Sequence, residues 1–458
     1  MGKPKPPVQK NDQLIGDVID FTFLGMGVIK VDNYPIFIAN TIVGEKIEFI
    51  VTKVAASYAF GKVQTIIKES ENRVKNLHPQ LINSGIAPLI HIEYSEQLKL
   101  KQNQIEQLFK KQGVEVEVEP TIGMDEPTHY RNKTVVPIKN QDGKLVTGFY
   151  RRGSHRLVAI EDYYLNDPVI DQTVGLVRDI LQKYFVQAYD DETKTGSVRY
   201  IMVRRGYYSH QLMVVLVSAK KKIPNQDEIT KDIQETIPEL KSLILNYNPR
   251  QTNVQLGEDN KILAGNGYIT DTLLGKEFII GPNSFYQVNP QTTEVLYSLA
   301  AEKANLTKEQ LVIDAYSGIG TIGITVADKV KKVIGVEIVE PAVVDAKVNA
   351  EKNHIKNIAF INKDAPEQFI EWEREGIKPD VIFVDPPRKG LTEELIEAVA
   401  NIKPETFVYI SCNPATLARD AKQLIGSGFK IEGSITPLDQ FPQTTHVESI
   451  TVFKYNRN

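Results

Sequence analysis

The stretch Leu311-Val-Ile-Asp-Ala-Tyr-Ser-Gly-Ile-Gly-Thr-Ile-Gly323 decides the fold. Five residues typical of a buried strand lead directly into glycines spaced G-x-G-x-x-G. Such a turn lets a ligand approach the backbone at the start of the following helix, although a glycine trio alone also fits a plain tight turn. Glu337 ends the next predicted strand, where a carboxylate can accept hydrogen bonds from ribose hydroxyls. Together these features predict a site for a nucleoside-bearing cofactor.

Apolar strands alternate with helical segments from residue 310 onward. The predicted strands are Leu311–Ala315, Lys332–Glu337, Ala359–Asn362, Asp380–Asp385 and Thr406–Ser411, followed by two near Phe429–Thr436 and Val447–Tyr455. This βαβ alternation predicts an α/β fold of Rossmann-like type, with a doubly wound, mostly parallel sheet. In such a sheet the ligand binds at the carboxyl ends of the strands.

The preceding part of the chain predicts two further domains. The predicted organisation is a disordered basic arm at 1–10, a small closed β-barrel at 11–70, a central α+β domain at 71–280 and the catalytic domain at 281–458. A helix over 95–111, with Ser95 as its cap, is expected to pack on the catalytic domain.

Composition excludes several classes of protein. No stretch approaches the roughly 18 consecutive apolar residues of a membrane span, and the start of the chain lacks a signal-peptide core. The lone cysteine excludes an internal disulfide framework, which predicts a cytoplasmic protein. A net charge of −4 gives no general attraction for nucleic acid, so any RNA surface must be a local patch.

Three aspartates choose between the two common nucleoside cofactors. Asp314 closes the first strand, Asp364 follows the third, and Asp385 opens Asp385-Pro-Pro-Arg388 after the fourth. Each alone could be a helix cap. A dehydrogenase has no need for an acidic group and a rigid diproline beside the reacting centre, so the set predicts S-adenosylmethionine rather than NAD.

Cys412 is the candidate nucleophile. It lies in Ser411-Cys-Asn-Pro414, at the carboxyl end of the fifth strand and ahead of a helix whose dipole is expected to stabilise a thiolate. A single cysteine is otherwise most often a small buried hydrophobe. A thiolate here suits methylation of uracil carbon 5, because its addition at carbon 6 loads electron density onto carbon 5.

The same chemistry needs a base to remove the carbon 5 proton, and Glu448 is the candidate. On the last strand it shares a face with Ile450 and Val452, and apolar neighbours would raise the pKa of its carboxyl. A plain surface glutamate is the alternative. His446 shares the same face and is a rival base or a structural partner.

Five motifs in order resemble the RNA 5-methyluridine methyltransferase family, in particular its bacterial 23S ribosomal RNA branch. They are Ser284-Phe-Tyr-Gln-Val-Asn-Pro290, Asp314–Thr321, Asp385-Pro-Pro-Arg-Lys-Gly390, Ser411-Cys-Asn-Pro414 and His446-Val-Glu448. The segments Gly25-Met-Gly-Val28 and Val43-Gly-Glu-Lys46 make the barrel look like the RNA-binding TRAM domain of many members.

The resemblance implies roles for individual residues. Cys412 would be the nucleophile and Glu448 the base. The pocket for cofactor and target base would be lined by Gln287, Tyr316, Gly318, Gly320, Thr321, Glu337, Asp364 and Asp385, of which Gln287 and Tyr316 come from the resemblance alone. The implied partner is 23S ribosomal RNA, with no obligate protein partner and no membrane.

The chain departs from many relatives at four positions. Those relatives hold an iron–sulfur cluster on four cysteines of the central domain, and the matching residues here are His78, Ser84, Ala87 and Tyr163. One possible ligand cannot hold such a cluster, so neither a cluster nor another metal is expected. The central domain must then be held by packing.

A basic stretch of the central domain is the predicted RNA surface. Its cations are Arg131, Lys133, Arg151, Arg152 and Arg156, interleaved with Tyr130, Phe149 and Tyr150, and His446 is added from the catalytic domain. Phosphate pairing with aromatic stacking holds flexible RNA, although a solvated strand face is the plainer interpretation. The target uridine would have to be flipped out to reach Cys412.

Two other functions stay open. One is a uridine C5 methyltransferase acting on transfer RNA, against which the barrel speaks because that branch usually lacks it. The other is an RNA-binding assembly factor with an inactive methyltransferase fold, against which the intact Cys412, Glu448 and Gly318–Gly323 speak. Cluster-free members of the ribosomal branch include enzymes that modify two uridines, so a dual-site enzyme is favoured.

Overall fold

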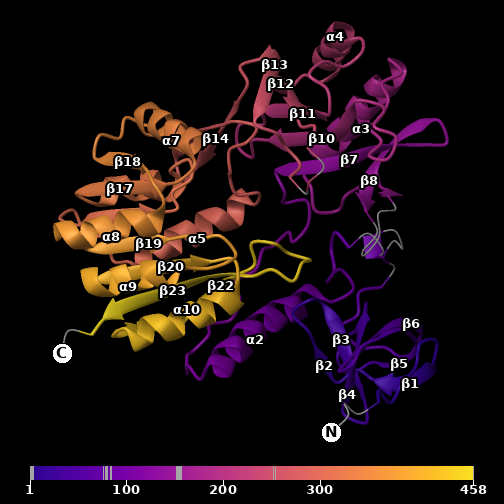
Figure 1. Ribbon diagram of the computed structural model, residues 1–458, viewed down its shortest axis with the longest axis horizontal. Helices are drawn as coiled ribbons and strands as arrows, with labels where there is room; N and C mark the ends of the chain where they lie inside the picture. The colour runs from indigo at the N-terminus through magenta and orange to yellow at the C-terminus, as the bar shows by residue number, and fades with distance from the viewer. Residues whose placement is uncertain are drawn as a thin grey trace.

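The structure is a computed structural model that describes residues 5–75, 77, 81–82, 85–150, 157–250, 252 and 254–456. Three sheets form three lobes (Figure 1). The N-terminal sheet lies at the lower right, the central sheet at the upper right and the catalytic sheet at the left, with helix α2 (Tyr94–Gln112) leading from the first lobe to the third. Within the described residues, no helix has both the length and the apolar character needed to cross a membrane.

The N-terminal lobe is a curled, barrel-like sheet of six short strands. They are β1 (Gln13–Asp17), β2 (Asp20–Phe21), β3 (Met26–Val31), β4 (Tyr34–Ala39), β5 (Lys46–Val54) and β6 (Ala59–Lys68), in the order β1-β5-β6-β4-β3-β2. Apolar residues alternate along β4 and β5 and fill the inside. Val8 also packs into this core and is 4% exposed, so the predicted disordered arm is wrong for the segment around Val8.

Helix α2 packs on the catalytic lobe, as the sequence predicts. Ile105 and Phe109 belong to one apolar cluster with the catalytic sheet, and α2 lies against α10 (Pro414–Gly426). Its predicted cap is wrong: Glu93 is the N-cap residue and makes no side-chain cap hydrogen bond, while Ser95 lies inside the helix.

The central lobe is a seven-stranded sheet with the order β13-β12-β11-β10-β7-β8-β9. Its strands are β7 (Lys133–Gln141), β8 (Lys144–Tyr150), β9 (Leu157–Ala159), β10 (Val198–Arg205), β11 (Leu212–Ser218), β12 (Leu240–Tyr247) and β13 (Asp259–Gly265). Apolar residues of helices α3 (Pro168–Lys183) and α4 (Gln226–Thr236) share a core with the sheet, and a hairpin, β14 (Ile269–Leu273) with β15 (Lys276–Ile280), leads to the catalytic lobe.

The catalytic sheet matches the prediction. Its strands are β16 (Leu311–Ala315), β17 (Lys332–Glu337), β18 (Ile358–Asn362), β19 (Val381–Val384), β20 (Thr406–Ser411), β21 (Phe429–Ile431), β22 (Thr436–Leu438) and β23 (Glu448–Tyr455). The first five are parallel, in the order β18-β17-β16-β19-β20, and the antiparallel β23 separates β20 from β21. The other helices are α5 (Pro290–Lys303), α6 (Thr321–Val326), α7 (Glu340–Lys352), α8 (Ala365–Glu375) and α9 (Glu393–Ile402).

The central and catalytic lobes share one hydrophobic core. Met202, Met213 and Val215 of the central sheet belong to the same cluster of buried side chains as Val312 and Phe383 of the catalytic sheet. A continuous close-packed interior resists relative movement of the parts that build it. The two lobes are therefore joined by a continuous apolar interior.

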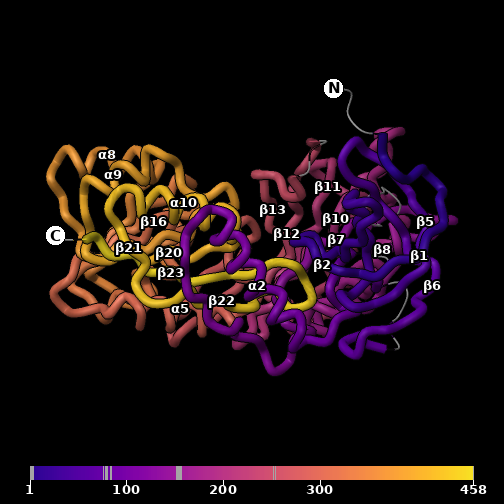
Figure 2. Tube along the Cα trace, turned by 90° about the horizontal axis from the view of Figure 1, so that it is seen from below, coloured from indigo at the N-terminus to yellow at the C-terminus, as the bar shows by residue number. Residues whose placement is uncertain are grey.

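The segment between β22 and β23, residues 439–447, is a loop that reaches away from the catalytic sheet past α2 toward the barrel (Figure 2). Its first part is tied to several other segments. Tyr130 donates to the Pro442 carbonyl at 3.1 Å, Leu89 donates to the Gln443 carbonyl at 3.0 Å, and Asn289 donates to the Gln440 carbonyl at 3.1 Å. The 439–447 loop is thus fixed before the chain enters β23.

The strongest tie of this loop is a buried ion pair. The Lys101 ammonium donates to the Asp439 carboxylate and, at 3.2 Å, to the Phe441 carbonyl, and both charged side chains are at most 2% exposed. Burial lowers the pKa of Lys101 and raises that of Asp439, while each charge stabilises the other. Breaking a buried pair by removing one partner leaves an uncompensated charge.

We expect Lys101→Met to lower the free energy of unfolding by about 3–5 kcal/mol, since Asp439 would stay buried and unpaired. Adding Asp439→Asn should recover much of that loss. Urea unfolding followed by the fluorescence of Trp372, the one tryptophan, measures both, because Trp372 lies in the same cluster as α2. Lys99→Met, on an exposed position of α2, is the control and should change little.

Candidate active site

The glycine-rich turn has the backbone that the sequence predicts. Gly318 and Gly320 have positive φ angles of 55° and 85°, which favour glycine. The Gly323 N–H donates to Asp314 at 2.7 Å, and the Gly318 N–H donates to Glu337 at 3.0 Å. Burial raises the pKa of Asp314 to about 7. The two carboxylates therefore hold the turn in place.

A cavity of about 570 Å³ opens beside this turn. Gly318, Glu337 and Phe285 line it, and the Phe285 side chain is 70% exposed. A Cβ at Gly318 would meet nothing within 4 Å, so the backbone faces open space. The volume and the mixture of an aromatic ring, a carboxylate and bare backbone fit a nucleoside cofactor. No group of side chains in the described ranges could hold a metal ion.

Of the predicted cofactor residues, Gly318 and Glu337 line this cavity, and the others lie outside its lining: Gln287, Tyr316, Gly320, Thr321, Asp364 and Asp385. Gln287 is buried, and its side chain hydrogen-bonds the hydroxyl of Tyr297, which also contacts Thr321 at 3.4 Å. Tyr316 follows β16 in the left-handed region, with φ of 64°. Asp364 occupies the N-cap position of α8 without a side-chain cap bond, so capping does not account for its carboxylate.

Cys412 and Glu448 face each other across two neighbouring strands. β20 pairs antiparallel with β23, and Ser411 is opposite Ser449. This register puts Cys412, the residue after Ser411, opposite Glu448, the residue before Ser449. Glu448 is 3% exposed, and its charge acts directly on the Cys412 thiol. The parallel neighbour β19 brings Asp385 to the same edge of the sheet.

Two carboxyl groups, Asp385 and Glu448, share this edge with the Cys412 thiol. Burial raises the pKa of Asp385 to about 7. Burial also raises the pKa of Glu448 well above its ordinary range, and the charge on Asp385 raises it further, as two carboxylates close together cannot both ionise easily. The guanidinium of Arg388 acts in the opposite direction on both Glu448 and Cys412.

The environment of the thiol differs from the sequence-based expectation. Helix α10 does follow Cys412, but burial and the charges of Glu448 and Asp385 raise the pKa of the thiol to about 12. The predicted stabilisation of a thiolate by the helix dipole is therefore outweighed. In the free protein Cys412 is a thiol.

His446 contacts Arg388, the cation that acts on Cys412 and Glu448. Its imidazole is 3.1 Å from the Arg388 guanidinium and packs edge-on against Phe441. Burial, with the positive charges of Arg388, Lys101 and Arg131, lowers the pKa of His446 to about 4. His446 is thus a neutral acceptor for Arg388.

The basic stretch of the central lobe is only partly as predicted. The charge of Arg131 acts on His446. Lys133 is largely buried, and burial together with the charges of Arg204 and Arg131 lowers its pKa to about 7. Tyr130 is buried and bonded to Pro442, so the prediction that it stacks on RNA is wrong.

The aromatic residues of the basic stretch differ in the same way. Phe149 packs edge-on against Tyr163, and Tyr150 is the exposed aromatic of the three. The three remaining predicted cations, Arg151, Arg152 and Arg156, lie outside the described residues.

Two of the four positions that correspond to cluster cysteines are described. Ala87 is 2% exposed and Tyr163 is 1% exposed, and each packs in an apolar cluster. His78 and Ser84 lie outside the described residues. The central lobe is held at Ala87 and Tyr163 by packing.

Sequence reasoning missed two charged residues of the site. Arg388 was quoted within Asp385-Pro-Pro-Arg388 but given no role, and its position beside two acids was the available signal. Lys101 gave no signal beyond being a lysine on a helix. Its partner, Asp439, is 338 positions away in sequence.

Comparison with known proteins places this geometry in a family. The family model described as tRNA (uracil-5-)-methyltransferase matches residues 93–455. A protein of Lactiplantibacillus plantarum named "uncharacterized RNA methyltransferase" is 51% identical over 98% of both chains. A protein of Enterococcus faecalis with the same name is 46% identical over 97% of this chain and 98% of its own.

A solved structure shares the fold. It is the Pyrococcus abyssi tRNA (uracil-54, C5)-methyltransferase in complex with S-adenosyl-L-homocysteine, with a TM-score of 0.77 and 24% identity. The match covers 96% of this chain and 100% of that one. The family model covers most of the chain and the Lactiplantibacillus plantarum relative is 51% identical to it, so the chain belongs to the tRNA (uracil-5-)-methyltransferase family.

Proposed function

We propose that this chain methylates carbon 5 of uridine in 23S ribosomal RNA with S-adenosylmethionine as donor. The observation that carries the proposal is the pairing of Cys412 with Glu448 across β20 and β23. One residue is a nucleophile and the other is a carboxyl whose raised pKa suits a base. Membership of a uracil-5 methyltransferase family supports the reaction type.

Cys412 would open the reaction by forming a bond to uracil carbon 6. The electron pair of the C5–C6 double bond then moves toward the O4 carbonyl, and carbon 5 becomes nucleophilic. The thiol must first lose its proton to solvent, which burial and the charges of Glu448 and Asp385 disfavour. Arg388 is the nearby cation that favours the thiolate.

Glu448 would end the reaction. Once carbon 5 carries the methyl group, the carboxylate takes the carbon 5 proton, the C5–C6 double bond re-forms and the carbon–sulfur bond breaks. Asp385 keeps the Glu448 pKa high and so makes it a stronger base. The cysteine leaves as thiolate, ready for another turnover.

The cofactor would occupy the cavity beside Gly318. Bound there, S-adenosylmethionine supplies an electrophilic methyl group. Glu337 would accept bonds from its ribose, and Asp364 would meet the adenine edge. The remaining cofactor residues of the proposal lie outside the cavity lining: Gln287, Tyr316, Gly320 and Thr321. Glu337 would have to exchange its bond to Gly318 for these.

The proposal of 23S ribosomal RNA rather than transfer RNA as substrate is based on the sequence motifs and not on the presence of the barrel. The five motifs resemble the 23S ribosomal branch, and the two relatives are named only as RNA methyltransferases. The Pyrococcus abyssi enzyme named for transfer RNA covers 96% of this chain, and the remaining 4% is shorter than the barrel. The barrel therefore does not separate the two targets, and transfer RNA is the second candidate.

We expect new 5-methyluridine in unmodified 23S ribosomal RNA, and none in transfer RNA, after incubation with the protein and S-adenosylmethionine. Mass spectrometry of nucleosides measures it, and fragment mapping counts one or two sites. A product in transfer RNA alone would replace the target. No product in either, from a folded protein, would contradict the chemistry and favour an inactive binding factor.

Glu448→Gln should accumulate a covalent protein–RNA complex, because Cys412 can still add to the base but the carbon 5 proton stays in place. Cys412→Ala should form neither complex nor product. Denaturing electrophoresis with labelled RNA detects the complex. Glu432→Gln, an exposed glutamate of the same lobe, is the matched control and should behave as wild type. A complex in Cys412→Ala would exclude the proposed nucleophile.

Alkylation by iodoacetamide should report the thiol pKa directly, since Cys412 is the lone cysteine. The reactive form is the thiolate, so a pKa near 12 predicts slow labelling at pH 8 that rises about tenfold per pH unit. Glu448→Gln removes a neighbouring negative charge, lowers that pKa and should speed labelling at pH 8, whereas Glu432→Gln should not. Wild-type labelling with an ordinary thiol pKa of about 8.5 would contradict this electrostatic picture.

A further inference from the structure

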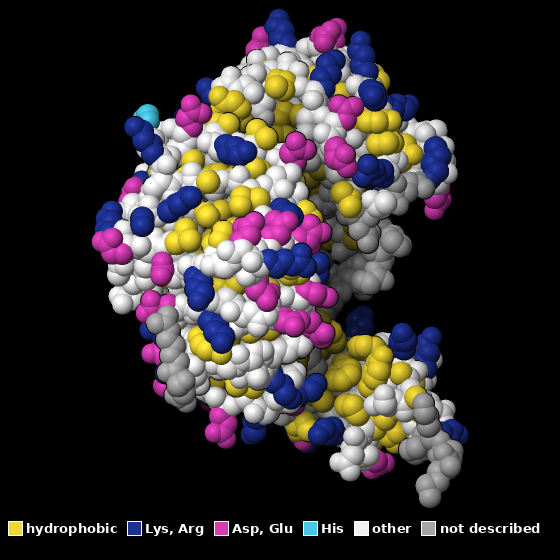
Figure 3. Space-filling model, turned by 60° about the vertical axis from the view of Figure 1, so that its left-hand side comes forward, with side chains coloured by type: hydrophobic (Ala, Val, Ile, Leu, Met, Phe, Trp, Pro, Cys, Tyr) yellow, Lys and Arg dark blue, Asp and Glu magenta, His cyan; other side chains and the backbone are white. Residues whose placement is uncertain are grey.

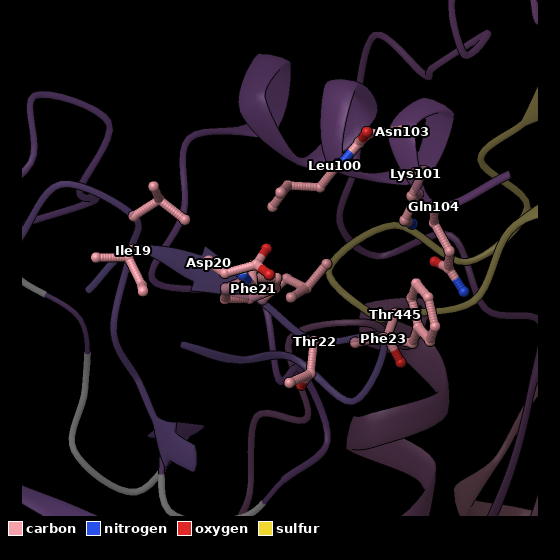
Figure 4. Close-up of a pocket in the computed structure, with 12 residues that line it drawn as sticks. Ile19, Asp20, Phe21, Thr22, Phe23, Leu100, Lys101, Asn103, Gln104 and Thr445 are labelled. Carbon is pink, nitrogen blue, oxygen red and sulfur yellow. The ribbon is translucent and has the colours of Figure 1, made fainter. Parts of the chain in front are cut away.

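A second, smaller cavity lies between the barrel, α2 and the 439–447 loop (Figure 4). We call it the barrel groove. Its volume is about 240 Å³. Its lining includes Phe21 and Phe23 from the barrel, Leu100 and Gln104 from α2, and Thr445 from the loop.

The barrel side of the groove is apolar and open to solvent. Ile19, Phe23 and Val43 line it and are 53%, 49% and 45% exposed, and the neighbouring Leu24 is 63% exposed. Figure 3 shows apolar side chains gathered on this lobe, at the lower right. Contiguous exposed apolar groups rimmed by polar ones mark a binding surface. The Phe23 ring is about half exposed, which leaves part of its surface open for stacking.

Two polar groups face the groove without a partner among the described residues. They are the side-chain amide of Gln104 and the hydroxyl of Thr445. By contrast, the Asp20 and Thr22 side chains accept backbone N–H groups of their own turn, as in the 2.8 Å bond from Phe21 to Asp20. An aromatic wall with a free amide opposite is the arrangement that holds an unstacked base by stacking and by its polar edge.

The groove adjoins the active site through the 439–447 loop. A Cβ at Gly25 of the barrel would come within 3.1 Å of Thr445, so the two surfaces already touch. Thr445 precedes His446, which binds Arg388, and it is three residues from Glu448. Three residues span at most about 11 Å, which is roughly three stacked nucleotides.

We propose that the barrel groove binds one unpaired base of the RNA substrate, within about three nucleotides of the uridine that reaches Cys412. The inference rests on the proposed function. The volume is below the roughly 300–1,000 Å³ of ordinary small-molecule pockets, which suits one base. The positive charges of Arg131 and Arg388 near His446 would face the backbone phosphates on the way to Cys412.

This contact gives the base-flipping step a second anchor. Extruding a uridine costs unstacking energy, and a flanking base stacked on Phe23 offsets part of that cost. Lys101 holds the floor of the groove in place through Asp439, so Thr445 is fixed when the base enters. The groove would therefore favour RNAs in which an unpaired flanking base lies at a fixed distance from the target uridine.

The test is a double-mutant cycle on RNA binding. Dissociation constants are measured by fluorescence anisotropy for wild type and Phe23→Ala, using unmodified transcripts of 23S ribosomal RNA fragments and of transfer RNA. Each transcript is also made with single abasic positions across the bound region. We expect Phe23→Ala to weaken binding by roughly 5- to 150-fold, as for loss of one stacked base. One abasic position should weaken RNA binding by the wild-type protein as much as Phe23→Ala does. The same abasic position should not weaken binding by Phe23→Ala any further.

Phe185→Ala is the matched control, because Phe185 is 81% exposed in the central lobe and lies outside the groove. Thermal unfolding of each variant checks that it is folded. The same double-mutant cycle is repeated with Gln104→Ala, which leaves Phe23 intact. Unchanged affinity in Phe23→Ala would overturn the proposal. Weaker binding that is additive with every abasic position would overturn it too, because Phe23 would then affect RNA binding without contacting a base.

Binding and methylation are scored separately, so the two proposals can fail independently. RNA that binds with the predicted coupling but gains no methyl group contradicts only the proposed function. RNA that is methylated without any effect of Phe23→Ala contradicts only the groove. Absence of binding by either transcript overturns both.

Discussion

The antiparallel pairing of β23 with β20 is the constraint on which the site depends. The parallel strands alone bring Asp385 and Cys412 to one edge of the sheet. The opposite run of β23 makes Glu448 the first residue of its strand at that same edge. A slip of one residue would turn every side chain of β23 to the other face. The register is held because β23 buries side chains on both of its faces, for example Ile450 on one face and Phe453 on the other.

That arrangement gathers negative charge around the proposed nucleophile. Cys412, Asp385 and Glu448 share a buried edge, and Arg388 is the cation that acts on Cys412 and Glu448. The free protein is therefore poised with its thiol protonated, and a reactive thiolate is favoured only when the surroundings change. A lone reactive cysteine is protected in this way from oxidation, which follows thiolate character and exposure.

Prediction from sequence succeeded for features set by residues close together in the chain. It failed for features set by contacts between residues that are far apart in the chain. The strands of the catalytic sheet follow from apolar runs and the glycine turn, and the positions of Cys412 and Glu448 follow from strand ends. The thiol pKa could not follow, because it depends on carboxylates that only the sheet register brings close. Likewise the burial of Tyr130 depends on the distant Pro442 carbonyl, and a run of basic and aromatic letters does not reveal it.

The common core of the central and catalytic lobes has a consequence for the substrate. Met202 and Met213 belong to the same buried cluster as side chains of the catalytic sheet, so a clamp-like opening of these lobes on the RNA would expose apolar surface to water and is disfavoured. The RNA, rather than the protein, must then change its conformation to bring a uridine to the site. Discrimination between RNAs would reflect how readily each one deforms, and stems that open easily would be modified in preference to stable ones.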